Sequence, residues 1–214
     1  MIRLIKNSII IVSLLAACRS NREETLPFYN DPEFTPRWIE SSSASYDSIH
    51  TIPSFSFTDQ DGAIVTEKMV EGKIYVANFM FTSCVSICPV MTDNMKILQK
   101  EFEHNEDVVL LSHSVLPTVD SVSVLKKYAE RKGIQSSKWY LLTGNRDSIY
   151  SLAKRQYYAG DSIGFYGNQR DFLHTENFIL VDKHRRIRGV YNGTIKFEMD
   201  RIIEDIRTLM KENY

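Results

Sequence analysis

The sequence of 214 residues has little cysteine, little tryptophan and no excess of either charge. It contains three cysteines, two tryptophans and 26 Lys and Arg against 27 Asp and Glu, which gives a formal net charge of −1. A nearly neutral chain has no overall attraction to a polyanion, so we expect no nucleic-acid partner. Hydrophobic residues make up 43% and charged residues 25%, a composition typical of a soluble protein with a core.

A long hydrophobic run is also missing near the N-terminus. The apolar segment at about 9–17 is too short to span a bilayer comfortably, but with Arg3 and Lys6 before it, it fits a signal peptide. It ends in LLAAC, which resembles the lipobox of bacterial lipoproteins, although an ordinary secretory signal with an incidental cysteine is the alternative. We expect residues 1–17 to be a lipoprotein signal peptide and Cys18 to be lipidated. The domain would then be held on a membrane of the bacterial cell envelope, outside the cytoplasm.

The next segment shows no sustained helical or strand period. Residues 19–50 hold three of the six prolines and a serine cluster at 41–45. We therefore expect residues 18–50 to be a tether, with at most a short docking strip at 34–39. The folded domain is expected to run from 51 to 214.

Strand and helix patterns then alternate. Residues 55–58 and 63–66 flank a turn and predict a hairpin. Strand-forming runs at 74–81, 108–112 and 139–142 are each followed by a helical pattern, at 89–102, 120–133 and 145–153, and strands at 177–181 and 187–191 precede an amphipathic helix at 199–210. This order predicts an α/β fold in which a central mixed sheet is flanked by helices and preceded by an N-terminal hairpin.

Two cysteines lie where the strand at 74–81 gives way to a helix, in VANFMFTSCVSICPVM. Backbone N–H groups at a helix N-terminus favour a thiolate, which is both the nucleophile and the metal-binding form of cysteine. The Cys-x-x-x-Cys spacing of Cys84 and Cys88 permits a disulfide or a shared metal ion, and two thiolates suit a soft ion such as Cu(I). An imidazole would be a natural third ligand.

Five histidines are candidates for that third ligand. His50 falls in the expected tether, and His104 and His184 are expected to be solvated. His113 ends a predicted strand and would face the same sheet edge as the cysteines, while His174 precedes the last two strands. Spacing alone leaves the choice open, because a single histidine is more often structural than a ligand.

The segments FTSCVSICPVM and FLHTENFILVD together resemble the Sco/SenC family of copper proteins. The family pattern is Phe-x-x-Cys-x-x-x-Cys-Pro with a distal histidine before the penultimate strand, and it is matched by Phe81, Cys84, Cys88, Pro89 and His174. The hairpin FSFTDQDGAIVT and the helix at 123–132 are also similar, so the resemblance extends from 52 to the C-terminus. It implies a thioredoxin-like fold, an N-terminal membrane anchor and a copper ion bound by Cys84, Cys88 and His174.

The resemblance also implies a role in assembling the dinuclear copper centre of a terminal cytochrome oxidase. The protein would deliver copper to the oxidase subunit that carries this centre and accepts the copper. Alternatively, it would reduce the cysteines of the centre, with Cys84 and Cys88 as a redox dithiol. Two positions depart from the family pattern, because Leu116 and Leu173 stand where the family usually has acidic residues. Carboxylates orient imidazole ligands, and Asp120 or Asp171 is close enough in sequence to compensate.

Three other interpretations of the cysteine pair remain. A thiol–disulfide oxidoreductase acting on other exported thiol proteins would use the pair without requiring His174. A thioredoxin-like peroxidase is disfavoured, because the Pro-x-x-x-Thr-x-x-Cys pattern is absent. A purely structural disulfide on a binding module would close only a small loop and gain little chain entropy. Met91 and Met95 carry soft sulfur near the cysteines, but their helical spacing favours core packing.

Overall fold

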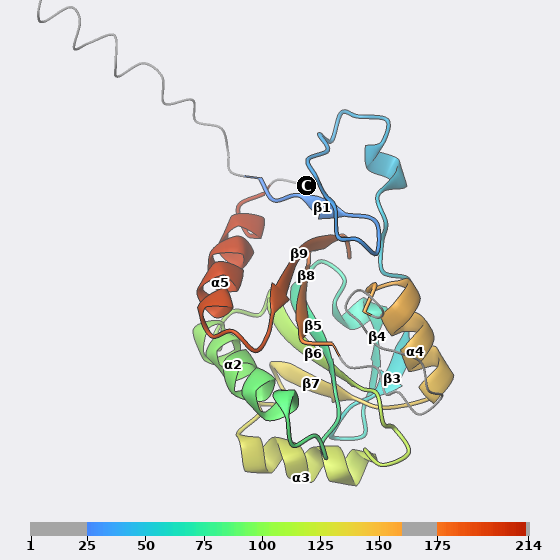
Figure 1. Cartoon of the computed structure of the whole chain (residues 1–214), viewed down its shortest axis with the longest axis vertical. Coiled ribbons are helices and arrows are strands. Elements are labelled where there is room, and N and C mark those ends of the chain that lie inside the picture. Colours follow the sequence, from blue (N-terminus) through green and yellow to red (C-terminus); the bar gives the residue numbers. More distant parts are fainter. Residues whose placement is uncertain (1–24, 160–174, 213–214) are drawn as a thin grey trace, which may run out of the picture.

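The centre of the protein is a five-stranded mixed sheet (Figure 1). The computed structural model describes residues 25–159 and 175–212. The strand order is β7-β6-β5-β8-β9, with β5 at Ile74–Met80, β6 at Val108–Ser114, β7 at Trp139–Leu142, β8 at Asn177–Val181 and β9 at Ile187–Asn192. The first three strands in this order are parallel, whereas β8 and β9 form an antiparallel edge.

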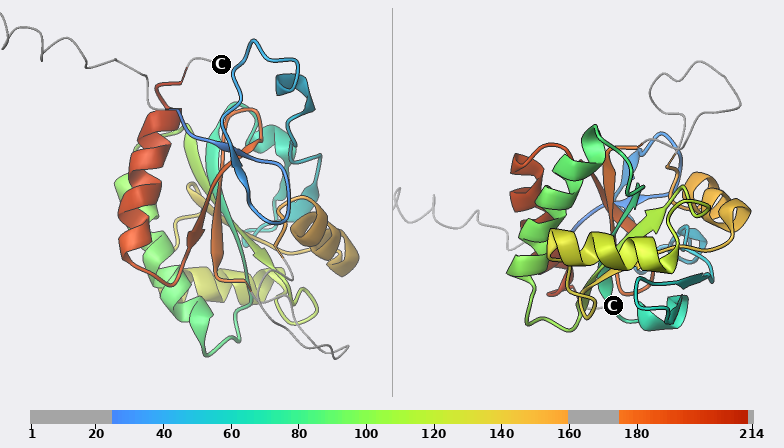
Figure 2. Two further views of the ribbon diagram at one scale, coloured as in Figure 1. Left: turned by 45° about the horizontal axis from the view of Figure 1, so that its top comes forward. Right: turned by 90° about the horizontal axis from the view of Figure 1, so that it is seen from below.

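Two cores cover the two faces of this sheet. The first core packs α2 (Ile87–Glu101), α3 (Val122–Lys132) and α5 (Phe197–Leu209) on one face. The second core packs α4 (Arg146–Arg155) and the hairpin of β3 (Ser56–Thr58) and β4 (Ile64–Thr66), which leads into the 3-10 turn η2 (Glu67–Met69), on the other. Figure 2 shows α2 and α5 on the side of the sheet opposite α4. Alternate residues of β5 enter the two cores, as the two-residue period of a strand requires.

The predicted elements and their order are confirmed. The helix that follows the cysteines buries Met91, Met95 and Leu98, so the two methionines pack in the core as their spacing indicates. Asn145 caps α4 by accepting a hydrogen bond from the Ser148 amide at 2.9 Å. Gly133 ends α3 in the left-handed conformation, with a φ of 69°.

The start of α3 differs from the prediction. The helical pattern begins at Asp120, which has a side chain suited to an N-cap, but the N-cap residue is Ser121, and no side-chain hydrogen bond caps this helix. The Asp120 carboxylate is fully buried and accepts hydrogen bonds from Thr82 and Ser114 instead. Asp120 therefore accepts hydrogen bonds from residues outside α3 instead of capping that helix.

The expected tether is in part folded onto the domain. Residues 25–50, here called the strap, contain the short antiparallel strands β1 (Phe28–Tyr29) and β2 (Pro36–Arg37) and the 3-10 turn η1 (Tyr46–Ser48). Phe28 and Ile49 are buried, and β1 contacts β9. The packed body thus begins well before residue 51, because these apolar side chains find partners that a local pattern does not reveal. Residues 18–24 lie outside the described part of the chain.

Candidate metal centre

The two cysteines occupy the turn between β5 and α2. Cys84 comes after the end of the strand, and Cys88 lies in the first turn of the helix, followed by Pro89. Proline fits there because the first N–H groups of a helix have no intrahelical partner. Val85, between the cysteines, is 95% exposed, so the outer side of the turn is open to solvent and to a partner.

The half-buried Cys84 is the thiol that ionises more readily. Burial alone raises its pKa, but hydrogen bonds from the backbone amides of Cys88, Ser86 and Ile87, together with one from the Cys88 side chain, lower the pKa below the ordinary value. These amides belong to the start of α2, where the helix dipole also favours negative charge. The fold therefore prepares a thiolate at position 84.

Cys88 is the protonated partner of this pair. Its side chain is 4% exposed and belongs to the first core. Burial raises the pKa of Cys88 to about 12, and its hydrogen bond and charge interaction with Cys84 act in the same direction, against an opposing hydrogen bond from the Phe81 backbone. Both cysteines are free thiols. The arrangement is a Cys84 sulfur of lowered pKa that accepts a hydrogen bond from the Cys88 thiol.

Asp120 fastens the loop that carries Cys84. One carboxylate oxygen accepts from the Thr82 hydroxyl at 2.5 Å, and the other accepts from the Thr82 amide at 3.1 Å and the Ser114 hydroxyl at 2.6 Å. The carboxylate thus joins the loop before Cys84 to the end of β6. Because both of its oxygens already accept hydrogen bonds within the protein, Asp120 does not act as the free carboxylate that would replace an acidic residue at Leu116.

We expect Asp120→Asn to loosen this loop. The amide offers one acceptor where the carboxylate offers two, so at least one buried donor loses its partner at a cost of about 1–3 kcal/mol. The free energy of unfolding should fall by that amount, and the rate of Cys84 alkylation should change several-fold. Asp93→Asn, at an exposed position on α2, is the matched control and should change neither. Equal behaviour of the two variants in chemical denaturation and alkylation would contradict the role of Asp120.

The candidate histidines differ in where they lie. His113 is fully buried on β6 among Phe55, Phe57 and Phe79, on the sheet face opposite the helix that carries Cys88. His113 does lie at the end of the sheet where the cysteines follow β5, but its side chain points into the second core, on the face opposite Cys88. His174 lies outside the described residues.

The remaining candidates add no third ligand to the structure as described. His50 bonds the Gln156 carbonyl through Nε2 at 2.9 Å, while His104 and His184 are exposed. Across residues 25–159 and 175–212, no group of three or more His, Cys, Asp or Glu side chains is placed to hold a metal ion. Cys18, Asp171 and Leu173 fall outside those ranges, so the centre that the structure itself presents is the pair of sulfur donors.

The sequence and the fold were then compared with known proteins. The sequence model described as SCO1/SenC matches residues 43–211, most of the chain. The chain belongs to the SCO1/SenC family. Among solved structures, a SCO1/SenC family lipoprotein from Bacillus anthracis is 33% identical, with a TM-score of 0.67 over 76% of this chain and 96% of that one. The predicted thioredoxin-like fold with a mixed sheet is therefore confirmed.

Two further structures connect this Sco protein to function. BsSco, described as a member of the Sco family of cytochrome c oxidase assembly proteins with a disulfide switch, is 30% identical, with a TM-score of 0.64 over 77% of this chain and 96% of its own. ScoI from Arabidopsis thaliana, solved with copper bound, is 28% identical, with a TM-score of 0.58 over 72% and 97% of the two chains. Relatives with this fold thus include a copper-bound protein and an oxidase assembly protein.

Proposed function

We propose that this Sco protein is a membrane-tethered copper carrier whose ligands are Cys84, Cys88 and His174. It delivers copper to the dinuclear copper centre of a terminal cytochrome oxidase, or prepares the thiols of that centre. The observation that carries the proposal is the pair of free thiols, Cys84 with a lowered pKa beside the buried Cys88, on a turn open to solvent. The copper-bound relative and the oxidase assembly protein support the choice of cargo and client.

The donor set fits copper in its reduced form. Two thiolates are soft ligands, and an imidazole would complete a three-coordinate site that excludes harder ions such as Mg²⁺. Binding requires Cys88 to lose its proton, so copper and the proton compete for the buried sulfur. Copper loading should therefore release a proton from Cys88, and the apparent affinity should rise with pH.

Copper can pass to an acceptor because the cysteine turn is exposed to solvent. A thiolate of the acceptor reaches the metal from the solvent side and replaces one protein ligand, after which the metal moves to the acceptor by further exchange. Cys84 is the accessible sulfur and the better leaving thiolate, whereas Cys88 is held in the core. We therefore expect Cys84 to be the first ligand that the acceptor displaces.

Thiol reduction is the second candidate function, and the asymmetry of the two thiols favours it. The Cys84 thiolate attacks a disulfide of the client, a mixed disulfide forms and one client thiolate leaves. Cys88 then loses its proton and attacks Cys84, which releases the second client thiolate and leaves a Cys84–Cys88 disulfide. Two electrons pass from the dithiol to the client. This reaction needs no histidine, so dependence on His174 separates the two functions.

Membrane attachment through lipidated Cys18 is part of the same proposal. Throughout the described residues, every helix is too short or too polar to span a bilayer. The Bacillus anthracis relative is a lipoprotein, and LLAAC has the form of a lipobox. A lipid-bearing Cys18 would hold the domain at the surface of the cell-envelope membrane, outside the cytoplasm.

A copper titration tests the carrier function. The reduced protein is titrated anaerobically with Cu(I) against a chelating competitor, and wild type is compared with Cys84→Ser, Cys88→Ser and His174→Ala. We expect one-to-one binding in wild type and a loss of at least about 100-fold in affinity, roughly 2.8 kcal/mol, in each variant. His104→Ala, at an exposed histidine, is the matched control and should bind as wild type.

The same titration distinguishes the two functions. Weak binding that does not depend on His174, together with ready reduction of a client disulfide, would overturn the carrier function and leave a thiol reductase. Tight binding lost in all three variants would establish the carrier site.

A further inference from the structure

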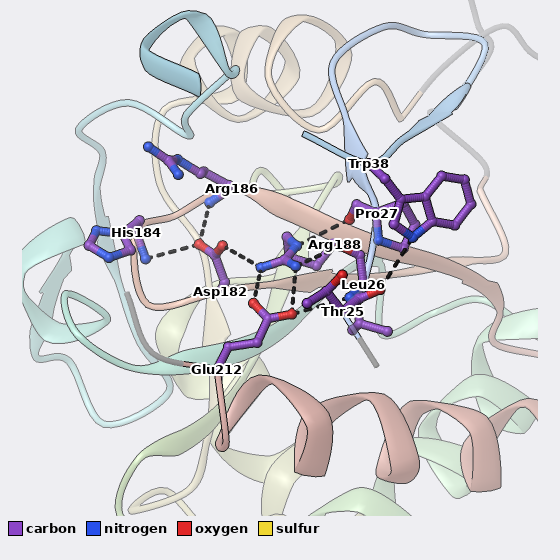
Figure 3. Close-up of polar contacts among 9 residues, drawn as sticks. All are labelled: Thr25, Leu26, Pro27, Trp38, Asp182, His184, Arg186, Arg188 and Glu212. Atoms are coloured by element: carbon purple, nitrogen blue, oxygen red, sulfur yellow. Dashed lines mark hydrogen bonds and ion pairs between the residues drawn. The ribbon is translucent and has the colours of Figure 1, made fainter. Parts of the chain in front are cut away.

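A buried arginine on β9 holds the beginning of the strap to the domain (Figure 3). Arg188 donates from Nε to the Pro27 carbonyl at 3.1 Å and from Nη2 to the Leu26 carbonyl at 2.7 Å. Both acceptors are backbone atoms of the first described residues of the chain. The guanidinium fork thus grips the main chain of the strap rather than one of its side chains.

Two carboxylates fix this arginine in place. Its Nη1 bonds Asp182 at 3.1 Å and Glu212 at 2.7 Å, and Nη2 bonds the other oxygen of Glu212 at 2.8 Å. Glu212 also accepts a hydrogen bond from the Leu26 amide at 3.2 Å, so the chain beyond α5 holds the strap as well. Arg188 is 2% exposed and Asp182 is fully buried. Removing the arginine would leave these carboxylates without their cation.

An aromatic contact and two hydrogen bonds extend the attachment along the strap. The Arg188 guanidinium stacks over the Phe28 ring, with its Cζ atom 4.1 Å from the ring centroid. Phe28 itself is 5% exposed. Farther along, the Tyr158 hydroxyl donates to the Asn30 carbonyl at 2.9 Å, and the His50 amide donates to the Asn30 side chain at 3.1 Å. The strap is therefore packed at both its beginning and its end.

The arginine and the cysteines lie at opposite ends of the domain. Tyr75, at the start of β5, pairs with Val181, the residue before Asp182. Cys84 follows the other end of the same strand, and seven strand residues separate the two ends by roughly 20 Å. Figure 1 agrees, with β1 and the end of α5 at the top and the start of α2 toward the bottom.

We propose that the strap is an orienting clamp that holds the cysteine end of the domain away from the membrane. This inference rests on the proposed lipid anchor at Cys18. Six residues lie between Cys18 and the strap, so the anchor can stand at most about 25 Å from Thr25. Without Arg188, the first strap residues, up to Asn30, would lengthen this linker and let the domain turn more freely.

The partner that fits this geometry is a membrane-bound acceptor with its thiols raised about one domain height above the bilayer. A clamped domain concentrates Cys84 and Cys88 in that layer, which raises their effective concentration toward such an acceptor. A released domain spreads the same cysteines over all heights and orientations.

Energy transfer to the membrane tests the clamp. The mature chain that begins at the lipidated Cys18 is reconstituted in vesicles whose headgroups bear an acceptor dye, with a fluorescent residue placed at Glu71 or Val119. Glu71 lies at the Arg188 end, since the next amide, that of Gly72, bonds the Lys183 carbonyl, whereas Val119 lies beside Asp120 at the cysteine end. We expect several-fold stronger transfer from Glu71 than from Val119 in wild type and a loss of that difference in Arg188→Met.

Hydrogen exchange confirms what the variant has changed. In Arg188→Met the Leu26 amide should exchange at least about ten-fold faster while the amides of β5 keep their protection. Arg207→Met, which removes an exposed arginine of α5, is the matched control and should behave as wild type in both measurements. If Arg188→Met loses protection throughout, Glu212→Gln replaces it, because that change keeps Asp182 as the counterion.

The outcomes separate the clamp from the proposed function. Equal transfer from Glu71 and Val119 in wild type, or an unchanged difference in Arg188→Met with Leu26 released, would overturn the clamp even if copper binding is intact. Failure of the chain to partition into vesicles would overturn it too. The predicted transfer and exchange in a protein that binds no copper would support the clamp and reject the carrier function.

Discussion

Iodoacetamide added in less than stoichiometric amount at pH 7 is expected to modify Cys84 at least about 30-fold faster than Cys88. The pKa of Cys84 lies below its ordinary value of 9.0, whereas that of Cys88 is raised to about 12. At pH 7 the Cys88 thiolate is therefore rarer by a factor on the order of 10³, and its greater intrinsic nucleophilicity offsets roughly 30-fold of this. The burial of Cys88 increases the ratio further.

Mass spectrometry of the digested protein measures the two rates directly. The rate at Cys84 should rise with pH and reach its plateau below the pH at which an ordinary thiol does, because hydrogen bonds from the start of α2 stabilise its thiolate. Cys88→Ala provides the control: it removes the thiol that donates to Cys84, so that plateau should move to higher pH. Equal rates at the two cysteines, or faster reaction at Cys88, would contradict the assignment of Cys84 as the attacking thiol and the first copper ligand to be displaced.

Much of this fold could be predicted because the local sequence pattern agrees with the burial that the tertiary structure requires. Residues 139–142 and 177–181 are the bounds of β7 and β8, since continuous apolar runs of strand formers are what a covered sheet buries. The cysteine turn was equally predictable, because a buried strand that runs into a proline-containing helix start places both thiols at one sheet edge.

What the sequence could not reveal depends on partners far apart in the chain. Asp120 has the spacing of a helix cap, yet its hydrogen bonds go to Thr82, which lies 38 residues earlier. The strap is polar and rich in proline, but Arg188, 162 residues beyond Leu26, holds its backbone. The orientation of His113 depends on which face of β6 it occupies, and a shift of one residue in a strand reverses that face.

His113→Phe is expected to raise the free energy of unfolding by about 2 kcal/mol at pH 7. Within residues 25–159 and 175–212, neither ring nitrogen of His113 has a hydrogen-bond partner, and the ring is fully buried. Each unsatisfied buried polar group costs about 1–3 kcal/mol. Four described rings surround it, those of Phe55, Phe57, Phe79 and Tyr157, with centroids 5.3–6.2 Å away, so a phenylalanine would pack against aromatic neighbours.

The increase in the free energy of unfolding caused by His113→Phe should grow as the pH falls. Burial lowers the pKa of His113 to about 3 from an ordinary 6.5. Between these values the unfolded chain binds a proton that the folded chain does not, so stability is lost as pH decreases through this window, by up to about 1.4 kcal/mol per pH unit. Among the four described rings around His113, Tyr157 alone is titratable, and burial raises its pKa, so it stays neutral in this range. At pH 5 the variant should therefore exceed wild type by more than it does at pH 7.

Urea denaturation at pH 7, 6 and 5 measures both parts of this expectation. His104→Phe removes an exposed histidine from the folded chain and the same group from the unfolded one, so it controls for changes in the unfolded state. A destabilised His113→Phe at every pH would mean that the larger ring overfills the second core, and His113→Leu then tests the same desolvation with a smaller side chain. If neither variant weakens the loss of stability between pH 7 and pH 5, the protonation of the unfolded chain at His113 is not what destabilises this protein in acid.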